Sequence, residues 1–184
     1  MTCTDGQWTA EDHPSPLPYT NWYPRRLFHS TGSAYAVIAG GMNLSPNSPP
    51  AAMNNALQII RPAVDGVDSG RFICIAAETN ELEVYSAEEI AAMIAANDTI
   101  PTCQIIHSVC LSPDGQYALL FTSNSTPDTA HLFLLRLEDL ALREIGGLAA
   151  SSIPFRSNYK PIIEWNSDTL IICVDATLQT YRFD

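Results

Sequence analysis

Lysine is almost missing from this chain, and basic residues of any kind are scarce. The 184 residues include 9 Lys+Arg against 20 Asp+Glu, which gives a formal net charge of -11 at pH 7. Nucleic acids and anionic membranes select basic surfaces, so we expect neither as a partner. No apolar run approaches the roughly 18 to 20 residues that a membrane span needs. The N-terminal residues also lack the basic and then apolar pattern of a signal peptide, which predicts a cytoplasmic protein.

Signatures of catalysis and of metal binding are missing as well. The sequence has no Gly-x-Ser-x-Gly elbow, no glycine-rich phosphate loop and no His-Glu-x-x-His pair. Its five cysteines are odd in number and include no Cys-x-x-Cys pair, which argues against a disulfide scaffold or a zinc site. Cys74 and Cys173 stand in apolar runs and are expected in the core. We therefore expect no enzyme, no cofactor and no metal site.

Apolar residues are abundant, and they set the size of the expected domain. The chain is 46% hydrophobic, which is enough to bury a full core at this length. Residues 1–20 are polar and contain three prolines, which favours an arm or an edge-covering extension over a strand. We expect residues 21–184 to form a single domain.

A short pattern occurs four times: a turn residue, an apolar strand, a polar loop and a second strand. The turn residues stand 38, 45 and 53 positions apart and are Gly32, Gly70, Gly115 and Asp168. The second strands are expected at 56–60, 81–85, 131–137 and 178–183. An apolar segment also leads into copies one, three and four, but the second copy lacks a clear one. Each copy predicts a small antiparallel sheet, and such sheets must stack to bury a core.

One helix is expected among the strands. Ser86 and Glu89 have the spacing of a capping box, and the apolar run that follows ends at Asn97. We predict a helix over 87–96. Its apolar residues Ile90, Met93 and Ile94 fall on one face, which should lie on the flank of a sheet or, alternatively, bind a partner.

The third and fourth copies resemble known repeats. The segment 108–121, Ser-Val-Cys-Leu-Ser-Pro-Asp-Gly-Gln-Tyr-Ala-Leu-Leu-Phe, followed by 131–140, resembles a blade of the TolB-like and WD-repeat β-propellers. Residues 162–172 resemble the same phrase more weakly. This resemblance implies an all-β domain of antiparallel β-meander repeats, arranged as a four-bladed ring or an open propeller-like fan. A sandwich of the same hairpins is the alternative.

Negative charge is concentrated in the middle of the chain. Residues 63–98 hold eight acidic residues and one basic residue, Arg71. If the carboxylates project from one edge of the second repeat, they form a surface that attracts a basic protein. The expected partner-binding residues are Asp65, Asp68, Glu78, Glu81, Glu83, Glu88 and Glu89. The alternative is a solvated face that only keeps the protein soluble.

Three functions are compatible with these features. The first is a cytoplasmic protein that captures one basic partner, similar in general character to the bacterial immunity proteins that neutralise a cognate toxin. The second is a propeller-like scaffold whose partners bind aromatic anchors at Trp22, Tyr23 and Trp165. The third is a hydrolase whose carboxylates come from separate repeats. The acidity and the missing motifs favour the first.

Overall fold

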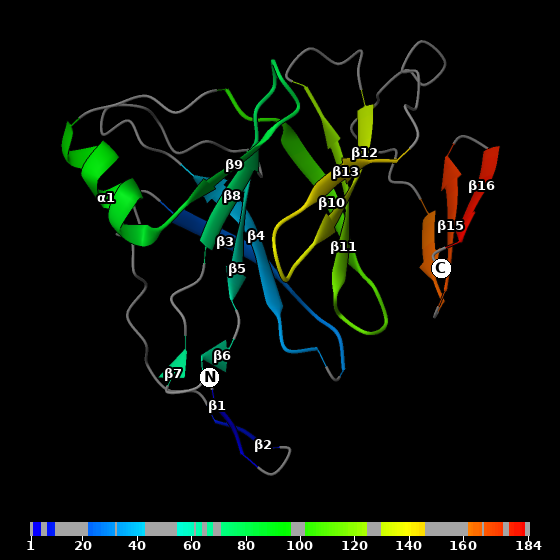
Figure 1. Cartoon of the computed structure of the whole chain (residues 1–184), viewed down its shortest axis with the longest axis horizontal. Helices are drawn as coiled ribbons and strands as arrows, with labels where there is room; N and C mark the ends of the chain where they lie inside the picture. The colour runs from blue at the N-terminus through cyan, green and yellow to red at the C-terminus, as the bar shows by residue number, and fades with distance from the viewer. Residues whose placement is uncertain are drawn as a thin grey trace.

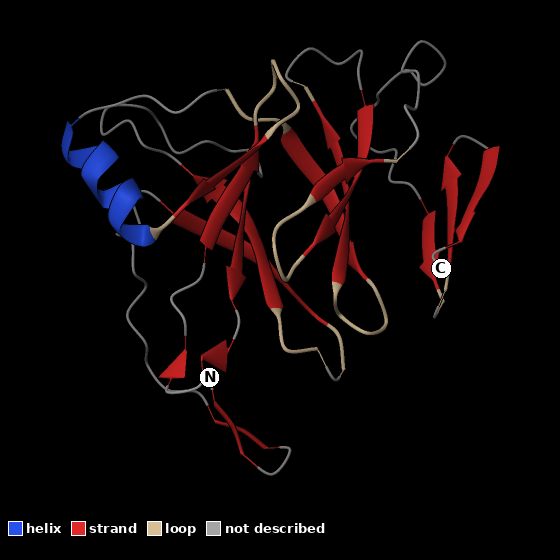
Figure 2. Ribbon diagram, in the orientation of Figure 1, coloured by secondary structure: helices blue, strands red, loops and turns tan. Residues whose placement is uncertain are grey.

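The computed structural model describes residues 2–4, 7–9, 22–31, 33–42, 55–60, 62–63, 66–67, 71–96, 102–124, 130–145, 162–166, 168–174 and 177–182. Within these ranges the chain consists of antiparallel strands and one helix (Figure 2). The predicted all-β class is therefore confirmed at the level of antiparallel strands with a single helix.

Twelve of the strands form three sheets, each built as an up-and-down meander. Sheet I comprises β3 (Trp22–His29), β4 (Ala36–Met42), β5 (Ala56–Ile60), β8 (Arg71–Ile75) and β9 (Leu82–Tyr85). Sheet II comprises β10 (Ile105–Leu111), β11 (Tyr117–Ser123), β12 (Ala130–Arg136) and β13 (Leu142–Glu144). Sheet III comprises β14 (Ile162–Trp165), β15 (Thr169–Val174) and β16 (Thr177–Arg182).

The first and second repeats do not form separate sheets, which corrects one expectation. The hairpin β8–β9 of the second repeat joins sheet I, because β8 pairs with β5 through Leu57↔Ile73 and its neighbours. The second repeat has no apolar segment leading into it, so β8 lacks a first strand of its own and pairs with the edge that β5 offers. The twelve strands of sheets I to III thus form three stacked sheets, and the described part of the chain shows no closed ring.

The N-terminal segment also differs from the expectation, because it contains two strands. β1 (Thr2–Thr4) pairs with β2 (Gln7–Thr9) across Asp5-Gly6, a residue pair that favours tight hairpins. The prolines that suggested an extended arm all follow this hairpin in the sequence. A second short pair joins β6 (Pro62–Ala63) to β7 (Gly66–Val67).

Alternation of side chains explains how the sheets stack. Along β11, Ala118 and Leu120 belong to the apolar cluster shared with sheet I, whereas Leu119 and Phe121 belong to the cluster shared with sheet III. Sheet II is therefore buried on both faces, as its nearly continuous apolar strands require. Figure 1 shows the resulting order of layers, from the helix through sheets I and II to sheet III.

The helix forms where the capping box predicted it. Helix α1 (Ala87–Ala96) begins after Ser86, whose Oγ accepts a hydrogen bond from Glu89 N at 3.1 Å. In return Ser86 N donates to Glu89 Oε2 at 2.7 Å. Ile90 is fully buried against Phe72 of sheet I, so the helix covers the outer face of that sheet. The described residues include no helix with the length and hydrophobicity of a membrane span.

Sheets I and II also contact each other through two turns, the one between β3 and β4 and the one between β10 and β11. Gly115 has φ = +66°, the positive value expected from its place in the Ser-Pro-Asp-Gly turn. Ser33 Oγ donates to Gly115 O at 3.1 Å, and Ser30 Oγ donates to Pro113 O at 2.8 Å. A Cβ added at Gly115 would lie 2.1 Å from Ser33 Cβ, so a side chain at this position has no room.

Candidate partner-binding surface

Five of the predicted carboxylates lie around β9 and the start of the helix, and we name them the acidic β9 surface. They are Glu78 and Glu81 in the turn before β9, Glu83 within it, and Glu88 and Glu89 in the first turn of α1. All are exposed except Glu83, which is half-buried. β9 is the terminal strand of sheet I, and its four residues span roughly 13 Å. The structure therefore places one carboxylate or more at each end of an edge strand.

The alternation expected in β9 is present. Leu82 and Val84 pack into the core between sheets I and II. Glu83 pairs with Cys74 of β8, so it stands on the opposite face of sheet I, the face that the helix covers in part. The apolar contacts of the two alternate residues hold Glu83 in place within the acidic β9 surface.

Charges of the acidic β9 surface in both β9 and α1 act on the side chain of Tyr85. Burial is the main cause that raises the pKa of Tyr85 to about 12, and the negative charges of Glu83 and Glu89 add to it. Both carboxylates therefore lie within electrostatic reach of one phenol. Tyr85 was not among the residues expected at this surface, although the alternation Glu83-Val84-Tyr85 already placed it on the same face as Glu83.

Glu89 has a structural role in addition to its charge. The backbone N–H of Ser86 and then the Ser86 hydroxyl donate hydrogen bonds to its carboxylate, which lowers the pKa of Glu89 below its ordinary value. Arg71 also favours the charged form from a longer distance. A change at Glu89 would therefore disturb the helix start as well as the surface charge.

The acidic β9 surface is poorly neutralised by its surroundings. Among the residues that the structure describes, the salt bridges join His131 to Glu144 and Arg136 to Asp139, and neither involves these five carboxylates. Arg71, exposed at the start of β8, is the described basic residue in this stretch of sequence. The charge asymmetry predicted from the sequence thus becomes a local excess of negative charge.

The remaining predicted site residues do not all join this surface. Asp65 and Asp68 lie outside the described residues, as does the side chain of Tyr23 in β3. Trp22 is 2% exposed and packs edge-to-face on Phe72, with ring centroids 5.2 Å apart. It is a core residue, which corrects its assignment as an aromatic anchor. Trp165 is half-buried against the cluster between sheets II and III.

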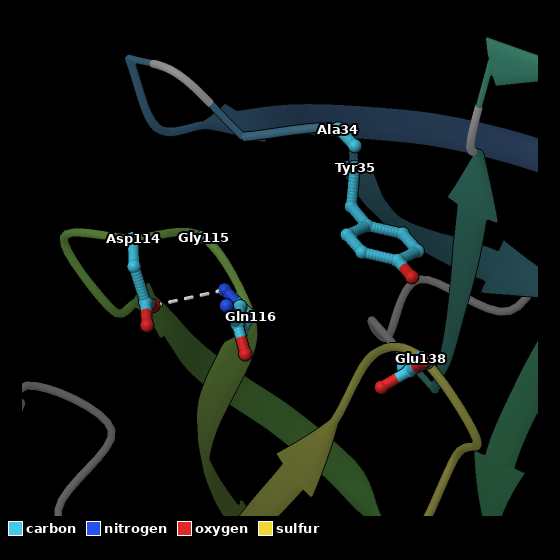
Figure 3. A pocket seen from close by; sticks show the side chains of 6 residues that line it. All are labelled: Ala34, Tyr35, Asp114, Gly115, Gln116 and Glu138. Atoms are coloured by element: carbon cyan, nitrogen blue, oxygen red, sulfur yellow. Dashed lines mark hydrogen bonds between the residues drawn. The ribbon is translucent and has the colours of Figure 1, made fainter.

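A pocket lies at the junction of the turns of sheets I and II. Its volume is about 310 Å³, and Tyr35, Gln116 and Glu138 face it together with Ala34, Asp114 and Gly115 (Figure 3). The Asp114 carboxylate accepts hydrogen bonds from Ser112 Oγ at 2.6 Å and from Gln116 N at 3.0 Å. Asp114 therefore stabilises its own turn, and Glu138 is the second carboxylate that lines the pocket.

The histidines of sheet II are held by neighbouring side chains. His107 Nε2 lies 2.8 Å from Ser123 Oγ, and burial lowers the pKa of His107. His131 Nδ1 lies 2.8 Å from Glu144 Oε1, and its ring stacks on Phe133. No group of three His, Cys, Asp or Glu side chains with the arrangement of a metal site occurs in the described part of the chain.

Comparison with protein-family models, with curated proteins and with solved structures found no significant match to this chain. The resemblance of 108–121 and 131–140 to propeller blades therefore remains an interpretation of the sequence.

Proposed function

We propose that this protein is a non-enzymatic cytoplasmic binding protein that captures one basic protein through the acidic β9 surface. The observation that supports this most is the convergence of five carboxylates on one edge strand, the turn before it and the helix start after it, with no salt bridge to any of them from the described residues. Such a field accelerates the encounter with a positively charged protein and orients it.

The rigidity of the surface also supports binding. The apolar partners of Leu82 and Val84 fix β9, and the reciprocal hydrogen bonds of Ser86 and Glu89 fix the first turn of α1. A backbone that is already fixed by a strand and a capped helix loses little conformational freedom when a partner arrives. Tyr85, half-buried among them, offers an aromatic ring beside the charges.

The specific form of this function that we propose is that of a bacterial immunity protein, which covers and neutralises a cognate toxin. A small acidic protein that binds a basic effector one-to-one fits this role. The partner to test is the product of the reading frame next to this gene. We expect a tight complex of one copy of each chain and survival of cells that produce both.

The experiment is co-expression of the two chains, followed by size-exclusion chromatography with light scattering and by a growth assay. We expect a 1:1 complex, growth arrest by the neighbouring protein alone, and rescue by the wild-type chain. Lysozyme, as a generic basic protein, should bind only weakly at physiological salt. A neighbouring product that is neither toxic nor bound would remove the immunity role.

A propeller-like scaffold is the second candidate, and one observation favours it. The first strands of the three sheets lie beside one another, since β10 contacts both β3 and β14. This is how inner strands are arranged in radially stacked sheets. Scaffolding predicts several partners and sensitivity to Trp165→Ala, whereas capture of one basic protein predicts sensitivity to charge reversal at Glu78 and Glu81.

A further inference from the structure

Two cysteines that are far apart in sequence meet under the helix. Cys74 of β8 is 1% exposed, and Cys103 is half-buried in the same apolar cluster. Cys103 forms an antiparallel bridge with Ala76, held by hydrogen bonds of 2.8 Å from Ala77 N to Thr102 O and from Gln104 N to Ile75 O. Because residues two apart in a strand share a face, this bridge places Cys103 on the face of Cys74.

Both side chains belong to one apolar cluster, and both are free thiols. A hydrogen bond joins them, with Cys74 as the donor that stabilises a thiolate on Cys103. This hydrogen bond lowers the pKa of Cys103, against the opposing effects of burial and of Glu83. The same hydrogen bond, burial and nearby negative charge raise the pKa of Cys74. One thiol is therefore activated and partly accessible, while the other is protonated and buried.

We propose that Cys74 and Cys103 form a dithiol oxidation site that closes to a disulfide when the protein meets a hydroperoxide. The inference does not depend on the proposed binding function. The disulfide would link β8 to the segment that follows α1, and the closed loop would contain β9 and the whole helix. Oxidation would thus tie the segment that leads into β10 of sheet II to sheet I by a covalent bond, with the acidic β9 surface inside the closed loop.

The chemistry balances with hydrogen peroxide as the oxidant. The Cys103 thiolate attacks one peroxide oxygen, the O–O bond breaks, and the released hydroxide takes up a proton, leaving a sulfenic acid on Cys103. The Cys74 sulfur then attacks the Cys103 sulfur, the S–O bond breaks, and the departing hydroxide takes the proton of Cys74. Two thiols lose two electrons, and one peroxide becomes two waters.

The test treats the reduced full-length protein with one equivalent of hydrogen peroxide and measures the intact mass and the non-reduced peptide map. We expect a mass lower by two hydrogen atoms, a peptide pair containing Cys74 and Cys103, and full reversal by dithiothreitol. Cys103→Ser should abolish the cross-link. Cys110→Ser is the matched control, because Cys110 is also half-buried. Burial raises the pKa of Cys110, so its loss should leave the Cys74–Cys103 cross-link intact.

A second pair of variants separates the chemistry from a merely structural effect. Cys74→Ser should leave a sulfenic acid on Cys103 that dimedone traps, since no second thiol resolves it. Glu83→Gln should increase the rate of oxidation, because the Glu83 charge raises the pKa of Cys103. Circular dichroism checks that each variant is folded. A wild-type protein that keeps both hydrogens, or that links other cysteines, would overturn the proposal.

Discussion

The contact between Gly115 and Ser33 provides a sharp test of how sheets I and II are stacked. Gly115→Ala adds a methyl group 2.1 Å from Ser33 Cβ and 2.2 Å from Ser33 Oγ, far inside the usual carbon contact of about 3.5 to 4.0 Å. The backbone φ of +66° adds a cost of roughly 1 to 2 kcal/mol for any residue with a Cβ. Overpacking adds roughly 1 to 3 kcal/mol. We expect a total loss of about 2 to 5 kcal/mol in the free energy of unfolding.

A double-mutant cycle separates the two costs. Ser33→Gly removes the two atoms closest to the new methyl group and leaves only Ser33 Cα, at 3.0 Å. Gly115→Ala in that background should therefore cost little more than the backbone part, about 1 to 2 kcal/mol. Ser33→Ala removes the hydroxyl but keeps Cβ, so there the full penalty should remain. Equilibrium urea denaturation of the six combinations at positions 33 and 115 measures these values, provided that the slope m stays constant. A penalty that is the same in all three backgrounds would show that the two turns are not packed together.

Three further predictions concern the helix, the core and the pH dependence. Ser86→Ala should destabilise the protein by about 1 kcal/mol through loss of the cap on α1, as measured by urea denaturation. Leu120→Ala, in the fully buried centre of β11, should cost about 2 to 5 kcal/mol, and the half-buried Ile171→Ala should cost less. Because burial lowers the pKa of folded His107, the unfolded chain binds a proton more readily, so stability should fall as the pH drops below about 6.5. His107→Gln should flatten this dependence between pH 7.5 and 5.5, and an unchanged slope would contradict it.

Short-range patterns in the sequence predicted most of the strands. The Ser-Pro-Asp-Gly turn, the capping box at Ser86 and the apolar strands after each turn residue all correspond to elements of the structure. These signals depend on neighbouring residues, so a sequence contains them in full. β13 was missed because its three residues, Leu142–Glu144, are too few to show alternation.

The pairing of distant strands could not be predicted in the same way. Whether β8 begins a new sheet or joins β5 depends on which edge is open in the folded protein, and no local residue records that. The burial of Trp22 has the same cause, because its environment is formed by Phe72, fifty positions later. In the candidate surface, the charge and the face of Tyr85 were visible in the sequence, whereas the burial that raises the pKa of Tyr85 depends on the folded protein.

The association rate of the complex with the neighbouring gene's product tests the central claim most directly. The double variant Glu78→Lys, Glu81→Lys makes the acidic β9 surface more positive by four charge units. The double variant Glu138→Lys, Glu164→Lys makes the same change in net charge on exposed residues elsewhere. A unit charge pair at 10 Å in water is worth about 0.4 kcal/mol, so the first double reversal should cost about 1.6 kcal/mol for each partner charge facing it. At about 0.01 M salt, where screening is weak, stopped-flow kinetics should show about a tenfold slower association for the first variant and less than about a twofold change for the control. Equal effects of the two variants, or none at all, would contradict the role of this surface.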